Sequence, residues 1–313
     1  MSNIRNYIED FLTYKESLGF SKKSYKGFLY DFERYTDYTE SFVFSQQSVA
    51  NFCVMRESEK ESGFRRRMTA LRELSKYLYA TNVSSFIIPT DILPPCNTYT
   101  PYIFSDAELN KLFKQAKQTK YNSRYPGNHL IISTVYRLIY FCGLRPNEGR
   151  ELLKEDVNLK NGTLLIRKNK TRKERLIPMA DDVTEMCREY LQSIQKIYPN
   201  SDYFFPSAQD SPISAKWLTR QFLKLWHQCK DLNNNSHVRV YDLRHRYATA
   251  IFMKWLDQGV DLYVLLPYLS AYMGHAHFKE TAYYIHLLPE KLKRTSALEW
   301  NSFAVYLPEV MHE

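Results

Sequence analysis

Residues 129–150 read HLIISTVYRLIYFCGLRPNEGR, a long apolar run followed by a break and a polar restart. The apolar run has the length of a buried helix, and Gly143 is the residue type that ends such a helix. Pro146 is favoured in the first turn of a following helix. Arg145 therefore lies in the break between two helices, where a fixed scaffold can project its side chain.

Downstream of this stretch, the pattern predicts a small hairpin followed by helices. Residues 163–168 (TLLIRK) and 174–179 (ERLIPM) read as two short strands joined by a basic turn, with Lys170 near its tip. A last helix contains Tyr283 and Tyr284. Further helices are expected between the hairpin and that last helix, at about 181–198, 214–230, 242–258 and 261–272. The predicted fold class is mainly α, with a small β-hairpin or sheet.

The N-terminal part reads as a separate helical domain. Three stretches have helical character, 4–20, 21–40 and 62–80. Residues 92–102 (ILPPCNTYTPY) lack periodicity and form a linker, after which Ser105 and Glu108 make a capping-box pattern at the start of the next helix. We therefore expect three parts, a helical domain at 1–96, a second domain of α+β type at 103–290 and a C-terminal tail at 291–313.

The composition favours a polyanionic partner. The net charge is +9, and the two parts of the chain share it unequally. Residues 1–96 hold 13 Lys and Arg against 12 Asp and Glu, whereas residues 97–313 hold 30 against 22, so 8 of the 9 surplus positive charges lie in the second part.

The cysteines and the apolar segments indicate the cell compartment. The five cysteines are widely spaced and lack a C-x-x-C pair, which argues against a zinc ribbon or a disulfide scaffold. The N-terminus does not resemble a signal peptide, and no stretch approaches the roughly 18 apolar residues of a membrane span. We therefore expect a cytoplasmic protein with reduced thiols.

Five scattered residues have the chemistry of a phosphodiester site, namely Arg145, Lys170, Arg244, His275 and Tyr284. A phenol attacks phosphorus once positive charge promotes its ionisation. Two arginines can fork onto the non-bridging oxygens and meet the charge that builds on the phosphorane. A lysine of lowered pKa can protonate the leaving 5′ oxygen, and a histidine can donate to a phosphate oxygen. This scheme needs no metal and no cofactor.

Each of these residues also has an ordinary explanation. An arginine at a helix start is usually a surface or ion-pair residue, and a basic hairpin is usually just solvated. Because the chain has 25 tyrosines, one lies nine residues after a histidine by chance. His275 and His277 suggest a metal site, but residues i and i+2 do not share a helix face, and no ligand cluster accompanies them.

The order and context of the five residues resemble the tyrosine recombinases, the phage-integrase and Xer-like family. Three segments match its first-arginine, second-arginine and L-G-H motifs, namely 143–148 (GLRPNE), 243–249 (LRHRYAT) and 273–275 (MGH). Tyr284 stands nine residues after His275, where the family places its nucleophile, and Lys170 matches the family's hairpin lysine five residues before Arg175. The resemblance covers about residues 1–290.

The resemblance implies a two-domain DNA clamp and a mechanism. Residues 1–96 would be the core-binding domain and residues 103–290 the catalytic domain. Tyr284 would attack the scissile phosphate, form a 3′-phosphotyrosyl bond and release a 5′-hydroxyl, with Lys170 as the acid. The phosphate would be held by Arg145, Arg244 and His275. Neither ATP nor metal would be consumed, because the phosphotyrosine keeps the bond energy.

Partners and supporting residues follow from the same resemblance. The family works as a homo-tetramer on two double-stranded DNA sites, and its C-terminal segment docks on a neighbouring subunit, a role that the apolar tail 291–313 would suit. Glu148 would orient the first arginine. Tyr241 departs from the pattern, because most members have a histidine there, and a phenol cannot shuttle protons near neutral pH. No arm-binding domain is expected before residues 1–96, which favours an Xer-like or transposon-borne recombinase.

Two other functions stay open beside recombination by integration, excision, transposition or dimer resolution. One is a DNA-binding or architectural protein without catalysis, which Tyr241 mildly favours. The other is a topoisomerase that relaxes DNA with the same chemistry but without partner exchange. For every reading, we predict DNA-backbone contacts from basic side chains on the third N-terminal helix and in the hairpin turn. They are Arg65, Arg66, Arg67, Arg172 and Lys173.

Overall fold

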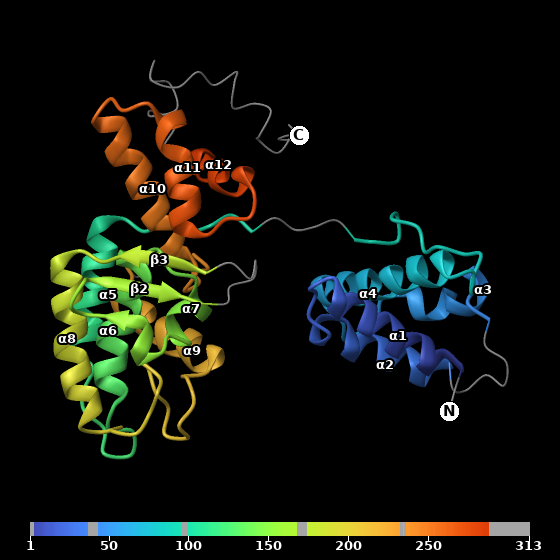
Figure 1. The fold of residues 1–313 in the computed structure, drawn as a ribbon, viewed down its shortest axis with the longest axis horizontal. Coiled ribbons are helices and arrows are strands. Elements are labelled where there is room, and N and C mark those ends of the chain that lie inside the picture. The colour runs from blue at the N-terminus through green and yellow to red at the C-terminus, as the bar shows by residue number, and fades with distance from the viewer. Residues whose placement is uncertain are drawn as a thin grey trace. The chain divides into compact units, whose positions relative to one another are not determined.

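A computed structural model describes residues 3–36, 43–94, 99–167, 174–231, 234 and 236–287. The chain divides into two compact units, Met1–Tyr99 and Thr100–Glu313 (Figure 1). Each unit has its own hydrophobic core. The fold class is confirmed, since the units consist of helices with one small antiparallel sheet. Four predicted features lie outside the described residues, namely Lys170, Arg172, Lys173 and the tail 291–313.

The first unit is a helical bundle built around its longest helix. The helices are α1 (Asn3–Ser17), α2 (Lys23–Thr36), α3 (Gln46–Val49), a 3-10 turn (Ala50–Cys53) and α4 (Glu61–Ala80). Helix α4 contacts both α1 and α2. Apolar side chains at helical spacing, such as Leu71, Leu74 and Leu78 on α4, are fully buried against these neighbours.

Arg67 on α4 is not available for the predicted DNA contact. Its side chain is 2% exposed, and it donates from Nε and Nη2 to the Glu59 carboxylate over 2.9 and 2.6 Å. The same guanidinium donates to the carbonyl oxygens of Phe52 and Val54. Arg67 therefore fastens the 52–59 segment to α4, while the neighbouring Arg66 is exposed.

Loss of this guanidinium is expected to destabilise the unit. For Arg67→Met we expect a fall of about 2 kcal/mol in the free energy of unfolding, the scale of a lost charged hydrogen-bond network whose remaining carboxylate can rehydrate. Arg66→Met, at the preceding and exposed position of the same helix, is the matched control and should change stability by less than about 0.5 kcal/mol. Urea unfolding of both variants measures the difference, and equal midpoints would contradict the structural role.

The second unit combines a helical bundle with the sheet. Its helices are α5 (Asp106–Lys117), α6 (Asn128–Phe141), α7 (Pro146–Arg150), α8 (Asp181–Gln195), α9 (Ala215–Cys229), α10 (Asp242–Asp257), α11 (Leu262–Met273) and α12 (Phe278–His286). The predicted capping box is confirmed, because Ser105 and Glu108 each accept from the other's backbone N–H at the start of α5. A 3-10 turn, Lys154–Asp156, precedes the sheet.

The sheet contains the predicted hairpin and one further strand. Its strands β1 (Val157–Asn158), β2 (Thr163–Ile166) and β3 (Arg175–Pro178) are antiparallel and lie in the order β1-β2-β3. In the β2–β3 register, Ile166 pairs with Arg175 at the end of the hairpin nearest its turn. This register places Arg175 at the start of β3, next to the hairpin turn.

Two cores hold the elements of this unit. The larger core surrounds α6, whose side chains pack with α5, α8 and α10. A smaller core joins α10, α11 and α12 through buried residues such as Phe252, Leu266 and Ile285. These three helices lie together at one end of the unit (Figure 1). The smaller core therefore places α12, which contains Tyr284, against α10. None of the helices among the described residues combines the length and the apolar character of a membrane span.

Candidate active site

The break after α6 has the geometry that places Arg145. Gly143 has φ +58°, and a Cβ there would lie 2.5 Å from the Tyr247 ring, so both the backbone conformation and the contact require glycine. Arg145 occupies the N-cap position of α7, and its backbone N–H donates to Glu148 Oε2 over 2.9 Å. Its side chain is thereby held at the start of a short helix, as the sequence predicted for a residue in the break.

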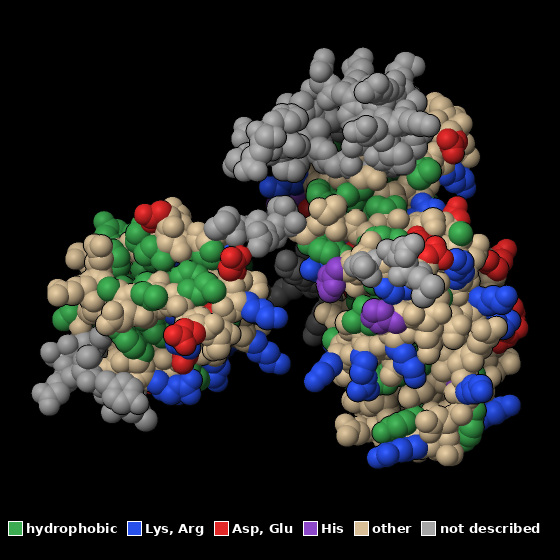
Figure 2. Space-filling model, turned by 180° about the vertical axis from the view of Figure 1, so that it is seen from behind, with side chains coloured by type: hydrophobic (Ala, Val, Ile, Leu, Met, Phe, Trp, Pro, Cys, Tyr) green, Lys and Arg blue, Asp and Glu red, His purple; other side chains and the backbone are tan. Residues whose placement is uncertain are grey.

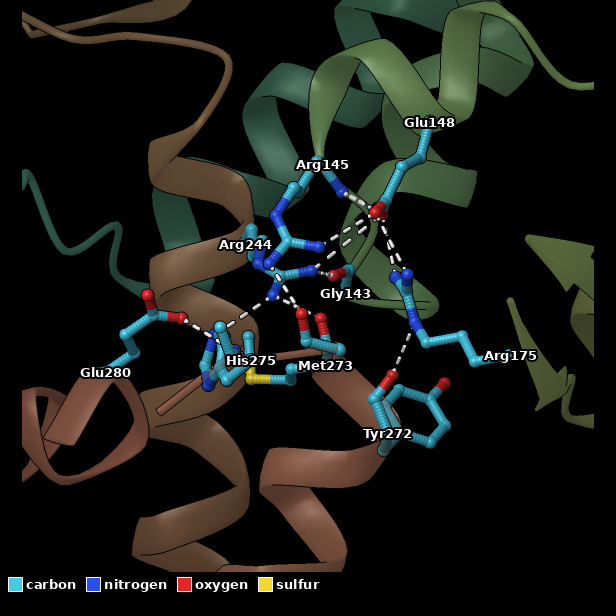
Figure 3. Close-up of polar contacts among 11 residues, drawn as sticks. Gly143, Arg145, Glu148, Arg175, Arg244, Tyr272, Met273, His275 and Glu280 are labelled. Carbon is cyan, nitrogen blue, oxygen red and sulfur yellow. Dashed lines mark hydrogen bonds and ion pairs between the residues drawn. The ribbon is translucent and has the colours of Figure 1, made fainter. Parts of the chain in front are cut away.

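Glu148 is the centre of an ion network with two arginines (Figure 3). Arg145 Nη1 donates to Oε1 over 2.9 Å, and Arg175 donates from Nη1 and Nη2 to both carboxylate oxygens over 2.9 and 2.7 Å. The Glu148 side chain is 5% exposed. Burial alone raises the pKa of Glu148, but the hydrogen bonds and charges of Arg175 and Arg145 outweigh it and lower the pKa to about 2. The carboxylate therefore stays ionised.

Arg244 on α10 is fully buried and held by backbone carbonyls. Nη1 donates to the Gly143 carbonyl over 2.7 Å, and Nη2 donates to the Met273 carbonyl over 2.6 Å (Figure 3). Nη2 also lies 3.1 Å from His275 Nε2. Burial lowers the pKa of Arg244 below the ordinary value of a guanidinium, yet such a group keeps its proton at any working pH. Arg244 thus joins the segments at 143 and 273–275.

His275 follows a second glycine that the site requires. Gly274 has φ +64°, its carbonyl accepts from Arg145 Nη2 over 2.8 Å, and a Cβ there would lie 2.9 Å from Arg175 Nη1. His275 Nδ1 lies 2.6 Å from Thr281 Oγ1. Burial, and then the charges of Arg244 and Arg145, lower the pKa of His275 to about 3. The imidazole is therefore neutral at physiological pH.

Tyr284 on α12 lies beside these groups with a 2% exposed side chain. Its ring is stacked with that of His275, at a centroid distance of 5.9 Å and an interplanar angle of 21°. Burial raises the pKa of Tyr284 to about 12, and the nearby Arg244 opposes this shift. Tyr283 is half-buried, with its ring centroid 6.2 Å from that of Tyr284.

Most of the predicted site residues lie in one place. Although they come from four separate segments, Arg145 and Arg244 lie beside Glu148, His275 contacts Arg244, and the Tyr284 ring stacks on that of His275. Tyr241 lies at the N-cap of α10 and lines, with Arg145 and Glu148, a cavity of about 800 Å³. Lys170, Arg172 and Lys173 lie outside the described residues. Arg65 and Arg66 lie on α4 in the first unit, where Arg65 donates to the Pro94 carbonyl.

The structure adds three residues that the sequence did not single out. Arg175 holds Glu148 and donates from Nε to the Tyr272 carbonyl over 2.8 Å. Thr281 contacts His275. The His245 ring lies between those of Tyr241 and Tyr284, at centroid distances of 5.0 and 5.5 Å. Arg175 was visible as the arginine that follows the hairpin lysine, whereas nothing in the sequence distinguishes Thr281. In the described ranges, no group of three His, Cys, Asp or Glu side chains has metal-ligand proximity.

The half-buried His245 predicts acid sensitivity. Burial lowers the pKa of His245 from 6.5 to about 4, so the unfolded chain binds a proton at higher pH than the folded chain. Its stability contribution is present above pH 6.5 and is lost as the pH falls from 6.5 toward 4. We expect Tm to fall over that window, and His245→Gln to flatten the dependence. The exposed His227→Gln is the control, and an unchanged slope in His245→Gln would refute the assignment.

Comparison with known proteins gives a consistent result. The sequence model of the phage integrase family matches residues 104–291. A putative integrase/recombinase, y4rE of Sinorhizobium fredii, is 29% identical over 89% of this chain and 90% of its own length. The tyrosine recombinase XerD of Rhizobium meliloti is 30% identical over 74% of this chain and 72% of its own length.

Solved structures with the same fold include two recombinases bound to DNA. XerH in a post-cleavage complex with palindromic difH substrate has a TM-score of 0.64 at 21% identity, covering 90% of this chain and 80% of that one. A lambda integrase fragment bound to a COC′ core site has a TM-score of 0.59 at 14% identity, covering 88% of this chain and 96% of that one. At these identities the likeness concerns the fold.

Proposed function

Since the chain belongs to the phage integrase family and is a site-specific tyrosine recombinase that cleaves and rejoins DNA, we propose that Tyr284 is its nucleophile. The observation that carries the proposal is the convergence of the Tyr284 phenol, the His275 imidazole and the Arg145 and Arg244 guanidiniums from separate segments. Two guanidiniums and a neutral imidazole beside a phenol suit a phosphodiester, which presents anionic oxygens to donors and phosphorus to a nucleophile.

The proposed step is an in-line displacement at phosphorus. The Tyr284 phenol gives its proton to water as its oxygen forms a bond to phosphorus and the bond from phosphorus to the 5′ oxygen breaks, which leaves a 3′-phosphotyrosyl linkage and a 5′-hydroxyl. Arg145 and Arg244 meet the charge on the non-bridging oxygens, and His275 donates to one of them. Lys170 is the proposed acid that gives the 5′ oxygen its proton. Attack by a 5′-hydroxyl from a partner duplex then reverses the step and restores the phenol.

In the DNA-free site, burial raises the pKa of Tyr284 to about 12, so the phenol is protonated and inert at neutral pH. Tyr241, at the position where the family has a histidine, lies at the N-cap of α10 and lines the cavity beside Arg145. We propose that Tyr241 supports the site by hydrogen bonding rather than by proton transfer.

The partners belong to the same proposal. The substrate is double-stranded DNA, and Lys and Arg side chains recur over the visible face of the Thr100–Glu313 unit (Figure 2). We propose that residues 1–96 form a core-binding domain with Arg65 and Arg66 on the DNA backbone, and that residues 103–290 form the catalytic domain, where Arg172 and Lys173 do the same. We also propose that the protein acts as a homo-tetramer whose subunits dock through the tail 291–313. The proposal further includes a cytoplasmic location and an origin in a mobile element.

Covalent trapping tests the proposal. We would incubate the protein with nicked duplexes from the DNA that flanks its gene and separate the products on a denaturing gel. The expected result is an adduct on the strand that retains its 3′ phosphate, with a free 5′-hydroxyl on the other product. Tight binding without an adduct on any duplex would contradict the catalytic proposal and favour an architectural DNA-binding protein. Relaxation of a plasmid without a candidate site would favour a topoisomerase instead.

A further inference from the structure

Thr281 links the site histidine to the helix of the nucleophile. Its side chain is fully buried on α12, three residues before Tyr284. Thr281 Oγ1 lies 2.6 Å from His275 Nδ1, a hydrogen-bond distance. Its hydroxyl is directed at the ring nitrogen that faces away from Arg244.

The contacts of His275 define its tautomer in the DNA-free protein. Arg244 Nη2 lies 3.1 Å from Nε2, and a guanidinium only donates hydrogen bonds. Nε2 must therefore be the acceptor, so the single proton of the neutral ring is on Nδ1 and is donated to Thr281 Oγ1. The charged groups that face this ring are the Arg244, Arg145 and Arg175 guanidiniums and the Glu148 carboxylate. Burial and the three guanidiniums lower the pKa of the ring and keep it neutral, while Glu148 opposes them.

This tautomer is the wrong one for binding a phosphate oxygen. A nitrogen lone pair at Nε2 would face another acceptor, whereas an Nε2–H group would donate to it. The change from one form to the other requires a partner at Nδ1 that accepts a hydrogen bond in the first form and donates one in the second. A hydroxyl can do both, because its hydrogen rotates, and a methyl group can do neither.

We propose that Thr281 is a positioning residue that lets His275 change from the Nδ1–H form of the DNA-free protein to an Nε2–H form when the scissile phosphate enters. The inference rests on the proposed function of the site. The change is balanced, since one proton leaves Nδ1 to water, one arrives from water at Nε2, and the Thr281 hydroxyl hydrogen turns toward Nδ1. The net charge of the ring is unchanged.

The tautomer is measured directly by ¹⁵N NMR of histidine-labelled protein, with His275→Gln to assign the signal. In the DNA-free wild type we expect a protonated Nδ1 and an unprotonated Nε2. With the nicked duplex that gives the adduct, bound to Tyr284→Phe so that no chemistry occurs, we expect a protonated Nε2. An Nε2–H form in the DNA-free protein would overturn the inference and would leave the proposed function standing, because trapping tests that separately.

A matched pair of variants separates the hydroxyl from packing. Thr281→Val keeps the shape and removes the hydroxyl, and we expect adduct formation to slow by roughly tenfold, the scale of one lost hydrogen bond, with DNA affinity unchanged. Thr281→Ser keeps the hydroxyl and should stay within about twofold of the wild-type rate. A packing role predicts the reverse order, since valine fills the site and serine leaves a void. That reverse order, or equal rates in all three proteins, would refute the inference.

Discussion

Tyr284→Phe is expected to abolish covalent attachment of the protein to nicked DNA. The substitution removes the only atom of the side chain that can bond to phosphorus, and it keeps the ring that is stacked 5.9 Å from His275. Because the side chain is 2% exposed, the phenylalanine remains packed and the fold is preserved. The adduct on a denaturing gel should fall below detection, while the affinity for the same duplex, measured by band shift, should stay within a few-fold.

Tyr283→Phe is the internal control for that result. Tyr283 is adjacent on α12 and half-buried, and neighbouring helix positions point about 100° apart, so only one phenol of the pair should reach the phosphate. We expect wild-type amounts of adduct from this variant. An adduct that persists in Tyr284→Phe but disappears in Tyr283→Phe would assign the nucleophile to the other tyrosine. Loss in both variants would indicate that the pair acts through packing of α12.

Glu148→Gln is expected to produce the second largest effect, on both stability and cleavage. The carboxylate accepts from Arg145 and Arg175 and is 5% exposed, so a neutral amide leaves two guanidiniums around one carbonyl oxygen and an NH₂ group. Removal of one partner from a buried ion pair costs about 3–5 kcal/mol in general, and we expect a loss near 3 kcal/mol. Adduct formation should also fall, because Arg145 loses the contact with Glu148 that orients its guanidinium.

The pH dependence gives this prediction a signature of its own. The pKa of Glu148 is lowered to about 2, below its ordinary value of 4.5, so its stability contribution is present above pH 4.5 and is lost as the pH falls toward 2. The variant should lack that part of the acid loss. Glu151→Gln is the control, since Glu151 is 51% exposed beside Arg150. Equal unfolding midpoints for Glu148→Gln and Glu151→Gln would contradict the network.

Much of the fold could be predicted because its signals are local. The capping box at Ser105 and the break at Gly143 each depend on a few neighbouring residues, and the structure places helix ends at both. Strand β1 was not predicted, because a two-residue strand has no periodicity and exists through its pairing with β2. Helix α7 ends after five residues, a length that depends on tertiary packing around Glu148 and Gly149.

The site residues that belong to sequence motifs could be predicted. Arg145, Arg244, His275 and Tyr284 were named from their order and context, and the structure brings them together. Lys170 stays a prediction. Thr281 could not be found, because its contact with His275 depends on how α12 packs rather than on any pattern of residues.

For the three consecutive arginines on α4, the sequence prediction was too general. Arg65, Arg66 and Arg67 are the same residue type, and we predicted the same DNA-backbone contact for each. Successive residues of a helix are rotated by about 100°, so three adjacent side chains cannot share a face. Arg66 is exposed, while Arg67 is directed inward to Glu59, a partner eight residues earlier that no local pattern identifies.

The carbonyls that hold Arg244 have a further consequence. The Met273 carbonyl is the last of α11, where aligned peptide dipoles leave partial negative charge, and the Gly143 carbonyl lies in the turn two residues after the end of α6. One helix end and one turn carbonyl therefore solvate the buried cation in place of water, and the Glu148 oxygen forms a longer ion pair with it at 4.0 Å. Because carbonyl dipoles rather than a carboxylate make the short contacts with Arg244, its charge is less fully neutralised before an anion arrives. The C-terminal end of α11 and the turn after α6 thus contribute to the electrostatic potential of the site.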